Sequence, residues 1–216
     1  GQDQSFGPNW DGCTNHVRYE VLKRLGYFVT ESSEHFAEYT PWFIKSHKPE
    51  LLDEFNIPIN EYIRRCESQI ADWDVQEKEL LANNDLVCEK SVEYAARIIT
   101  SMVTGEEDVI YGNVANNGLI PDLPANSCVE VPCITSLGKL TPQAVPALPL
   151  HLNRLIQTNI SVQQLTVEAL VTGKKEPIYH AAMLDPHTAA ELSLDQIWQM
   201  VDDLLEAHEG WIPKFS

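Results

Sequence analysis

Apolar residues recur at helical spacing through most of this chain and alternate in strand fashion only near its middle, and this uneven pattern restricts the folds open to it. Four segments, 14–25, 33–44, 58–83 and 89–103, are predicted to be helices, most of them from apolar side chains three or four positions apart. Helical periodicity returns in the last third of the chain. We therefore expect an α+β domain that is mostly helical, with a small central sheet.

Glycines and capping residues mark the expected ends of these helices. Gly26, Gly105 and Gly173 can each close a helix, because glycine adopts the left-handed backbone of a helix C-terminus at little cost. The spacing within Ser161–Gln164 and within Ser193–Gln196 is that of a capping box. We therefore predict that a helix starts at each of these two sites.

Two segments in the middle of the chain have the alternation of β-strands. Residues 108–114 run into the turn signal Asn116-Asn117-Gly118, and residues 127–133 form the second strand. Glu130 would lie on the solvent side of that strand. A loop interrupted by prolines, 142–149, is expected to follow. The apolar face of the second strand would carry Val129, Val131 and Cys133.

The chain is strongly acidic, which excludes two classes of partner. Its 216 residues contain 15 Lys plus Arg against 32 Asp plus Glu, a formal net charge of −17. Such a surface repels nucleic-acid phosphates and anionic lipid, so we expect neither a nucleic acid nor a membrane as partner. No apolar run approaches the length needed to span a bilayer.

The cysteines indicate a reducing compartment. They are odd in number and form no CxxC pair. Cys128 and Cys133 share one predicted strand but, being five positions apart, would face opposite sides, too far from each other for a disulfide. We therefore expect reduced, mostly buried thiols in a cytoplasmic protein. The five are Cys13, Cys66, Cys88, Cys128 and Cys133.

The densest group of chemically useful side chains lies at residues 30–39. On a helix, His35 and Tyr39 are four positions apart and share a face, with Glu31 one turn earlier and Glu38 beside them. Acid–base chemistry needs a titratable base and a proton relay on a rigid element, and this cluster supplies both. The flanking carboxylates would raise the pKa of the histidine.

Two other interpretations of this cluster stay open. One is a solvated helix start, with Ser32 or Ser33 as N-cap and Glu34 favoured by the helix dipole. The other takes the same histidine and glutamates as metal ligands, but their spacing fits no standard zinc motif. Cys13 and His16 are an equally weak metal candidate, because no second Cys or His pair accompanies them.

The turn at Asn116 and Asn117 is the second candidate site. Side-chain amides at the end of a strand can hydrogen-bond sugar hydroxyls. The structural alternative is that Asn and Gly occur here because they tolerate the left-handed backbone of a tight turn.

One motif is long and rich in polar residues: VRYEVLKRLGYFVTESSEH at 17–35, followed by Glu38 and Tyr39. It resembles glycoside hydrolase family 4, in particular the α-galactosidase branch of that family. The resemblance covers nearly the whole chain through further motifs that occur in order. They are Asn113 to Leu123, Val129 to Pro132, Leu165 to Ala169, Asp185-Pro186, Ala207-His208 and Trp211 to Pro213.

The resemblance implies a fold and a reaction. The family is similar to lactate and malate dehydrogenases, with an N-terminal dinucleotide-binding domain and a C-terminal α+β substrate domain. Bound NAD would oxidise the C3 hydroxyl of the sugar, and a base would remove the proton at C2. The aglycone would leave by elimination, water would add, and the hydride would return. A divalent metal, usually manganese, would polarise the oxygens at C2 and C3.

Two parts of the family pattern do not occur in this sequence. No glycine-rich dinucleotide fingerprint follows a strand, and the Cys and His that bind the metal belong to family motifs upstream of Gly1. We therefore expect residues 1–216 to be the substrate domain of a longer protein, with its NAD-binding domain and metal ligands outside this chain. No metal or cofactor ligand is assigned here, and the isolated chain is expected to be inactive.

The resemblance also implies roles for individual residues. The tyrosine base proposed for the family falls in the region of His35 to Tyr39, and Tyr39 is the candidate, with His35 and Glu38 beside it. A nearby metal would lower the pKa of the phenol so that it can act as a base. The candidates for binding the sugar are Glu34, Asn116 and Asn117.

The expected partners are an α-glycoside such as a galactoside, the protein's own NAD-binding domain and further copies of itself. No cluster of Lys or Arg lies near residues 30–40 or 113–118, which favours a substrate without a phosphate group. Two other classes of function stay open. One is a stand-alone sugar-binding or oligomerisation module without redox chemistry, and the other is a helical interaction or structural protein.

Overall fold

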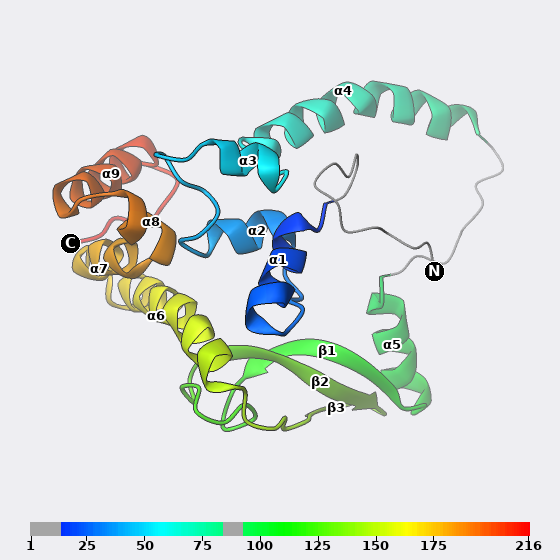
Figure 1. Ribbon diagram of the computed structural model, residues 1–216. Coiled ribbons are helices and arrows are strands. Elements are labelled where there is room, and N and C mark those ends of the chain that lie inside the picture. Colours follow the sequence, from blue (N-terminus) through cyan, green and yellow to red (C-terminus); the bar gives the residue numbers. More distant parts are fainter. Residues whose placement is uncertain (1–13, 84–92) are drawn as a thin grey trace. The chain divides into compact units, whose positions relative to one another are not determined.

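The computed structural model describes residues 14–83 and 93–216, and Figure 1 shows their helices and strands. The chain divides into two compact units. The first contains the residues up to Ile57 together with Pro121–Ser127 and Ala147–Ser216, and the second contains Pro58–Ile120 and Cys128–Pro146. Cys13, Cys88 and the start of the predicted helix 89–103 lie outside the described residues.

The described part of the first unit is helical. Its helices are α1 (His16–Leu25), α2 (Ser33–Glu38), α3 (Glu50–Glu54), α6 (Leu150–Thr172), α7 (Glu176–Leu184), α8 (Pro186–Glu191) and α9 (Leu194–Ala207). Across residues 14–83 and 93–216, no helix is both long enough and apolar enough to cross a membrane.

The second unit holds the sheet. It contains helices α4 (Glu61–Ala82) and α5 (Ala95–Thr104) and strands β1 (Asp108–Ala115), β2 (Cys128–Ser136) and β3 (Lys139–Pro142). The mostly helical α+β fold with a small sheet is therefore confirmed.

The sheet is antiparallel in the order β1-β2-β3, and its alternation follows the sequence. Val129, Val131 and Cys133 are buried on one face, while Glu130 is exposed, as predicted. Helix α5 joins this unit through a buried polar contact. The Ser101 hydroxyl donates to the main-chain oxygen of Thr135 at 2.7 Å, and the Thr135 hydroxyl donates back to Ser101 Oγ at 2.9 Å. Both polar side chains are thereby satisfied inside the unit.

The third strand was not expected from the sequence. Residues 139–142 pair with Cys133–Ser136 of β2 after a tight turn in which Gly138 has a φ of 72°. Pro142 is the last residue of β3, so the predicted loop 142–149 begins one residue later than expected. The segment is short and has little apolar alternation, so only its pairing with β2 defines it as a strand.

Most helix ends lie where the glycines and capping residues of the sequence predicted them. Gly26, Gly105 and Gly173 follow α1, α5 and α6 with left-handed φ values of 77°, 82° and 69°. The capping box at Ser193 is present: Ser193 Oγ accepts from Gln196 N at 3.4 Å, and the Gln196 side chain accepts from Ser193 N at 2.9 Å. These predictions are confirmed.

Two helix predictions are wrong. Ser161 does not start a helix, because α6 begins at Leu150 and runs through it. The Ser161 hydroxyl instead donates to the main-chain oxygen of Gln157 at 2.9 Å, one turn back, which satisfies it inside the helix. The predicted helix 33–44 ends early, with α2 stopping at Glu38.

The core of the first unit forms around α1 and α2. Apolar side chains four positions apart on α1 and adjacent on α2 are buried together with residues of the chain that follows. The buried members are Val17, Val21, Phe36, Ala37, Phe43 and Ile57.

The side chain of Arg18 holds the loop between α1 and α2 against α1 by hydrogen bonds. Its Nε and Nη2 donate to the main-chain oxygen of Val29 at 3.0 and 2.8 Å, and its Nη1 donates to Asn15 Oδ1 at 3.0 Å. The guanidinium also lies 4.1 Å from the centre of the Phe28 ring. This one side chain therefore holds the loop that leads into α2.

We predict that Arg18→Ala lowers the free energy of unfolding by about 2 kcal/mol, because it leaves the part-buried Val29 carbonyl without its charged donors. The measurement is urea unfolding followed by circular dichroism. Arg24→Ala is the control, since the ion pair of Arg24 with Glu20 at 2.7 Å is exposed and its loss should cost less than about 0.5 kcal/mol. Equal losses in the two variants would contradict the role assigned to Arg18.

Candidate functional site

Helix α2 begins with a complete N-cap. Ser32 has extended backbone and its hydroxyl accepts from His35 N at 3.2 Å, while Glu31 accepts from Ser32 N at 2.8 Å. Glu34 lies in the first turn, where a carboxylate is favoured by the helix dipole. The capping role that the sequence left open is thus present, and Ser32, not Ser33, performs it.

The two sides of α2 differ sharply. Phe36 and Ala37 are buried in the core of the first unit, and the hydroxyl of the buried Thr40 donates to Phe36 O at 2.8 Å. His35 and Tyr39 lie on the other side and are exposed. The polar side chains predicted to carry chemistry are therefore not needed for packing.

His35 and Glu38 form an ion pair on this exposed side. His35 Nδ1 lies 2.9 Å from Glu38 Oε2, and the two side chains are 48% and 47% exposed. The hydrogen bond to Glu38 raises the pKa of His35 above its ordinary value, with smaller contributions from the charges of Glu38, Glu31 and Glu34, and partial burial opposes the shift. The carboxylate neighbours therefore stabilise the imidazolium, as the sequence predicted.

Tyr39 completes this group, which we call the α2 cluster: His35, Glu38 and Tyr39. The Tyr39 ring lies beside the imidazole, with 6.3 Å between ring centres and 30° between ring planes. The side chain is 46% exposed. Within the described parts of the chain its hydroxyl makes no hydrogen bond, so the phenol oxygen is open to a ligand.

The described residues do not form a metal site. No three His, Cys, Asp or Glu side chains within residues 14–83 and 93–216 come together as a metal ion requires. The described residues therefore do not fit the metal that the family resemblance implies.

Of the cysteines in that part of the chain, Cys66, Cys128 and Cys133 are free thiols, with Cys128 exposed and Cys133 buried.

Asn116 and Asn117 lie in the second unit and have different environments. The side chain of Asn116 is 0% exposed; its Nδ2 donates to Ile120 O at 3.1 Å and its Oδ1 accepts from Ile120 N at 2.7 Å. These two hydrogen bonds stabilise the turn, which is the structural alternative considered for Asn116. Asn117 is exposed and has a left-handed φ of 41°, so only its amide is open to a sugar.

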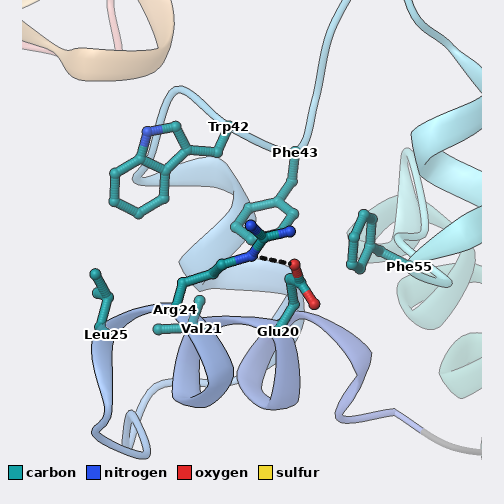
Figure 2. Close-up of a pocket in the computed structure, with 7 residues that line it drawn as sticks. All are labelled: Glu20, Val21, Arg24, Leu25, Trp42, Phe43 and Phe55. Carbon is teal, nitrogen blue, oxygen red and sulfur yellow. Dashed lines mark hydrogen bonds and ion pairs between the residues drawn. The ribbon is translucent and has the colours of Figure 1, made fainter.

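A pocket near α1 was not found from the sequence. It has a volume of about 310 Å³, and Figure 2 shows the side chains around it. Arg24 Nε donates to Glu20 Oε1 at 2.7 Å within this pocket. The only signal in the sequence is the presence of three aromatic residues, Trp42, Phe43 and Phe55. The lining residues are Glu20, Val21, Arg24, Leu25, Trp42, Phe43 and Phe55.

Comparison with known protein families decides what kind of domain this is. The family model of the family 4 glycosyl hydrolase C-terminal domain matches residues 3–188. The chain belongs to the family 4 glycosyl hydrolases. The family expected from the motifs at 17–39 is thereby confirmed.

Relatives and solved structures agree with this family 4 domain. It is 50% identical over 200 residues to the alpha-galactosidase of Bacillus subtilis (strain 168), covering 93% of this chain and 46% of that protein. The crystal structure of lplD from Bacillus subtilis matches with a TM-score of 0.79 at 19% identity, over 92% of this chain and 46% of that one.

A second solved structure shares the fold. It is a 6-phospho-alpha-glucosidase from gut microorganisms in complex with NAD and Mn²⁺, with a TM-score of 0.70 at 16% identity, over 93% of this chain and 44% of that one. The family 4 domain therefore spans about half the length of the proteins that it matches.

We predict that Glu38→Gln in this family 4 domain returns the pKa of His35 toward 6.5, the ordinary value for histidine, because the charged hydrogen-bond acceptor is lost. The stability from the pair is fully present below the unfolded-state pKa and is lost as pH rises through the raised folded-state pKa. The measurement is an NMR titration of the His35 ring.

Glu34→Gln serves as the matched control for this prediction. Its charge contributes least to the shift, so the His35 pKa should change much less than in Glu38→Gln. A pKa that stays raised in Glu38→Gln would show that another group supports the imidazolium.

Proposed function

We propose that this family 4 domain is the substrate-side half of an α-galactosidase that depends on NAD and a divalent metal. The observation that carries the proposal is the 50% identity to the Bacillus subtilis alpha-galactosidase, which extends over 93% of this chain. The α2 cluster supports it, because it presents acid–base groups on an exposed side of a helix that is anchored in the core.

Tyr39 is the proposed base that removes the proton from C2 of the galactosyl ring. Its exposed hydroxyl can be reached by a sugar, and a base must come within hydrogen-bond reach of the proton that it takes. The His35 imidazole lies beside the Tyr39 ring, with 6.3 Å between ring centres, and is held by Glu38 at 2.9 Å. His35 and Glu38 are thus proposed to position the base.

A contact to the sugar is proposed for Glu34 in the first unit, and Asn117 in the second unit is a separate candidate. Glu34 lies one residue before His35 in the first turn of α2, and a carboxylate there can accept hydrogen bonds from sugar hydroxyls. Asn117 offers an exposed amide at the end of β1. Asn116 is left out of this proposal because its amide is buried and bonded to Ile120.

The cofactors are proposed to come from the remainder of a longer protein. The described residues provide no converging metal ligands, and the sequence has no glycine-rich dinucleotide fingerprint. The 6-phospho-alpha-glucosidase with the same fold was solved with NAD and Mn²⁺. Redox and metal chemistry are therefore assigned to groups outside this chain.

Tyr39→Phe in the full-length protein is expected to abolish exchange of the C2 proton with solvent, because the phenol oxygen that accepts the proton is removed. NAD affinity should stay unchanged. The measurement is deuterium incorporation at C2 followed by NMR, with NAD binding measured by calorimetry.

Tyr27→Phe is the matched control, since Tyr27 is 49% exposed and lies in the same unit. It should keep the wild-type exchange rate. Exchange at the wild-type rate in Tyr39→Phe would remove Tyr39 from the role of base and leave His35 as the next candidate.

The 216-residue chain alone is expected neither to bind NAD nor to hydrolyse an aryl α-galactoside. The full-length protein should hydrolyse it, and only when NAD, manganese and a reductant are supplied together. Calorimetry with NAD and a chromogenic assay measure the two parts. Micromolar NAD binding by the 216-residue chain would contradict the assignment of the cofactor site, and a full-length protein inactive on α-galactosides but active on another glycoside would contradict the substrate class.

A further inference from the structure

The carboxylate of Glu191, the last residue of α8, binds a segment that lies far earlier in the chain. Glu191 Oε1 accepts from Lys45 Nζ at 3.0 Å, and Glu191 Oε2 accepts from Ser46 N at 3.0 Å and from Ser46 Oγ at 2.7 Å. The side chains of Glu191 and Lys45 are only 13% and 17% exposed. Because both carboxylate oxygens have donors, hydrogen bonds offset the cost of covering this charge from water. We call the group Lys45, Ser46 and Glu191 the Glu191 clamp.

The carboxylate of the Glu191 clamp stays ionised at neutral pH. Its hydrogen bonds lower the pKa of Glu191 to about 2. The Ser46 hydroxyl is the largest cause, followed by the Ser46 amide and Lys45, while desolvation opposes the shift. Hydrogen bonds to a charged group are stronger than neutral ones. The clamp is therefore a strong contact between α8 and residues 45–46.

The clamp holds the segment by which the chain leaves α2. Residues 39–49 connect α2 to α3 without a helix or strand of their own, so regular backbone hydrogen bonding does not fix their course. Phe43 is buried in the core of the first unit, but apolar burial has no preferred direction. The hydroxyl of Thr40 is bonded back to α2, at Phe36 O. The clamp therefore supplies a directional contact to the segment that begins at Tyr39.

The helices that carry the clamp also reach the start of this segment. Asn159 of α6 donates from Nδ2 to the main-chain oxygen of Tyr39 at 3.5 Å. Helix α8 packs on α7, and α7 packs on α6. The start of α8 is fixed by Asp185, whose side chain accepts from Thr188 N at 2.7 Å. Tyr39 and Ser46 are therefore both bound by one group of packed helices.

We propose that Glu191 is a positioning residue for Tyr39. By holding Lys45 and Ser46 it fixes the segment that leaves α2, so that the phenol keeps its place beside the His35 imidazole, with 6.3 Å between ring centres. Glu191 acts through the segment and is not itself a catalytic residue. This inference rests on the proposed function, which assigns Tyr39 as the base. Glu191 lies beyond residues 3–188, the part that the family model matches, so the family match gives it no role.

The first test measures the segment itself, by hydrogen–deuterium exchange of the full-length protein followed by mass spectrometry. Glu191→Ala should raise amide exchange in peptides spanning residues 36–46 at least about tenfold, because bonds to a charged group are lost and the segment opens locally. The rise should include the Tyr39 amide, which donates to His35 O at 3.0 Å. The Gly26 amide, which donates to Leu22 O at 2.8 Å at the end of α1, should exchange as in the wild type.

Two further variants separate the clamp from a general loss of a carboxylate. Asp202→Ala is the matched control: Asp202 of α9 pairs with Lys175 at 3.7 Å in the same unit and is 51% exposed, and its loss should leave peptides 36–46 unchanged. Glu191→Gln should restore part of the protection, because the amide oxygen still accepts from Ser46 while the ion pair with Lys45 is lost.

The second test measures exchange of the C2 proton of a galactoside in the full-length protein. Glu191→Ala should lower the maximal rate of this exchange at least about tenfold, because a displaced base is less effective. The KM for the galactoside should change less than about threefold, since the groups proposed to bind the sugar remain. Glu191→Gln should lie between Glu191→Ala and the wild type, and Asp202→Ala should match the wild type in both quantities.

Two outcomes would overturn the proposal. Unchanged amide exchange at residues 36–46 in Glu191→Ala would show that the segment is held without the clamp. Raised amide exchange together with a wild-type rate of C2 exchange would show that the place of the base does not depend on Glu191. Failure of the proposed function gives a different result, in which Tyr39→Phe keeps C2 exchange. The amide exchange would then still decide whether Glu191 holds Tyr39.

Discussion

The candidate site depends on the Arg18 guanidinium, whose hydrogen bonds join helix α1 to the loop that precedes α2. Arg18 lies on α1 between the buried Val17 and Val21, and it binds the main-chain oxygen of Val29 through two nitrogens at 3.0 and 2.8 Å. Charged hydrogen bonds of this kind are stronger than neutral ones. Because the loop is fixed at Val29, Ser32 is in position to start α2, and the start of α2 decides which way its side chains face.

Helix α2 has only six residues, too few to be stable by itself. Its stability comes from Phe36 and Ala37 in the core and from the cap at Ser32. The side chains of His35 and Tyr39 contribute to neither. They leave an imidazole and a phenol side by side on the exposed side of the helix, with 6.3 Å between ring centres.

The second unit presents the reverse situation. Its sheet and α5 are joined by buried contacts such as Ser101 with Thr135, while no residue of α4 is buried and its Ile70 and Trp73 side chains are exposed. The hydrophobic effect acts against such an arrangement.

The sequence alone determined the features that depend on a few neighbouring residues. Glycine closed α1 and α6, the Ser193 capping box opened α9, and alternation placed Val129 and Val131 inside the sheet, because these signals act through the local backbone. The motifs at 17–39 also indicated the family. Tertiary structure decided the rest: whether the spacing at Ser161 lay at a helix end or inside α6, that Asn116 faces Ile120, and that Trp42 and Phe55 meet α1 around one pocket. The pocket depends on contacts between residues distant in sequence, and at Ser161 and Asn116 the surrounding chain selects one of several locally possible structures, so a local pattern specifies none of these outcomes.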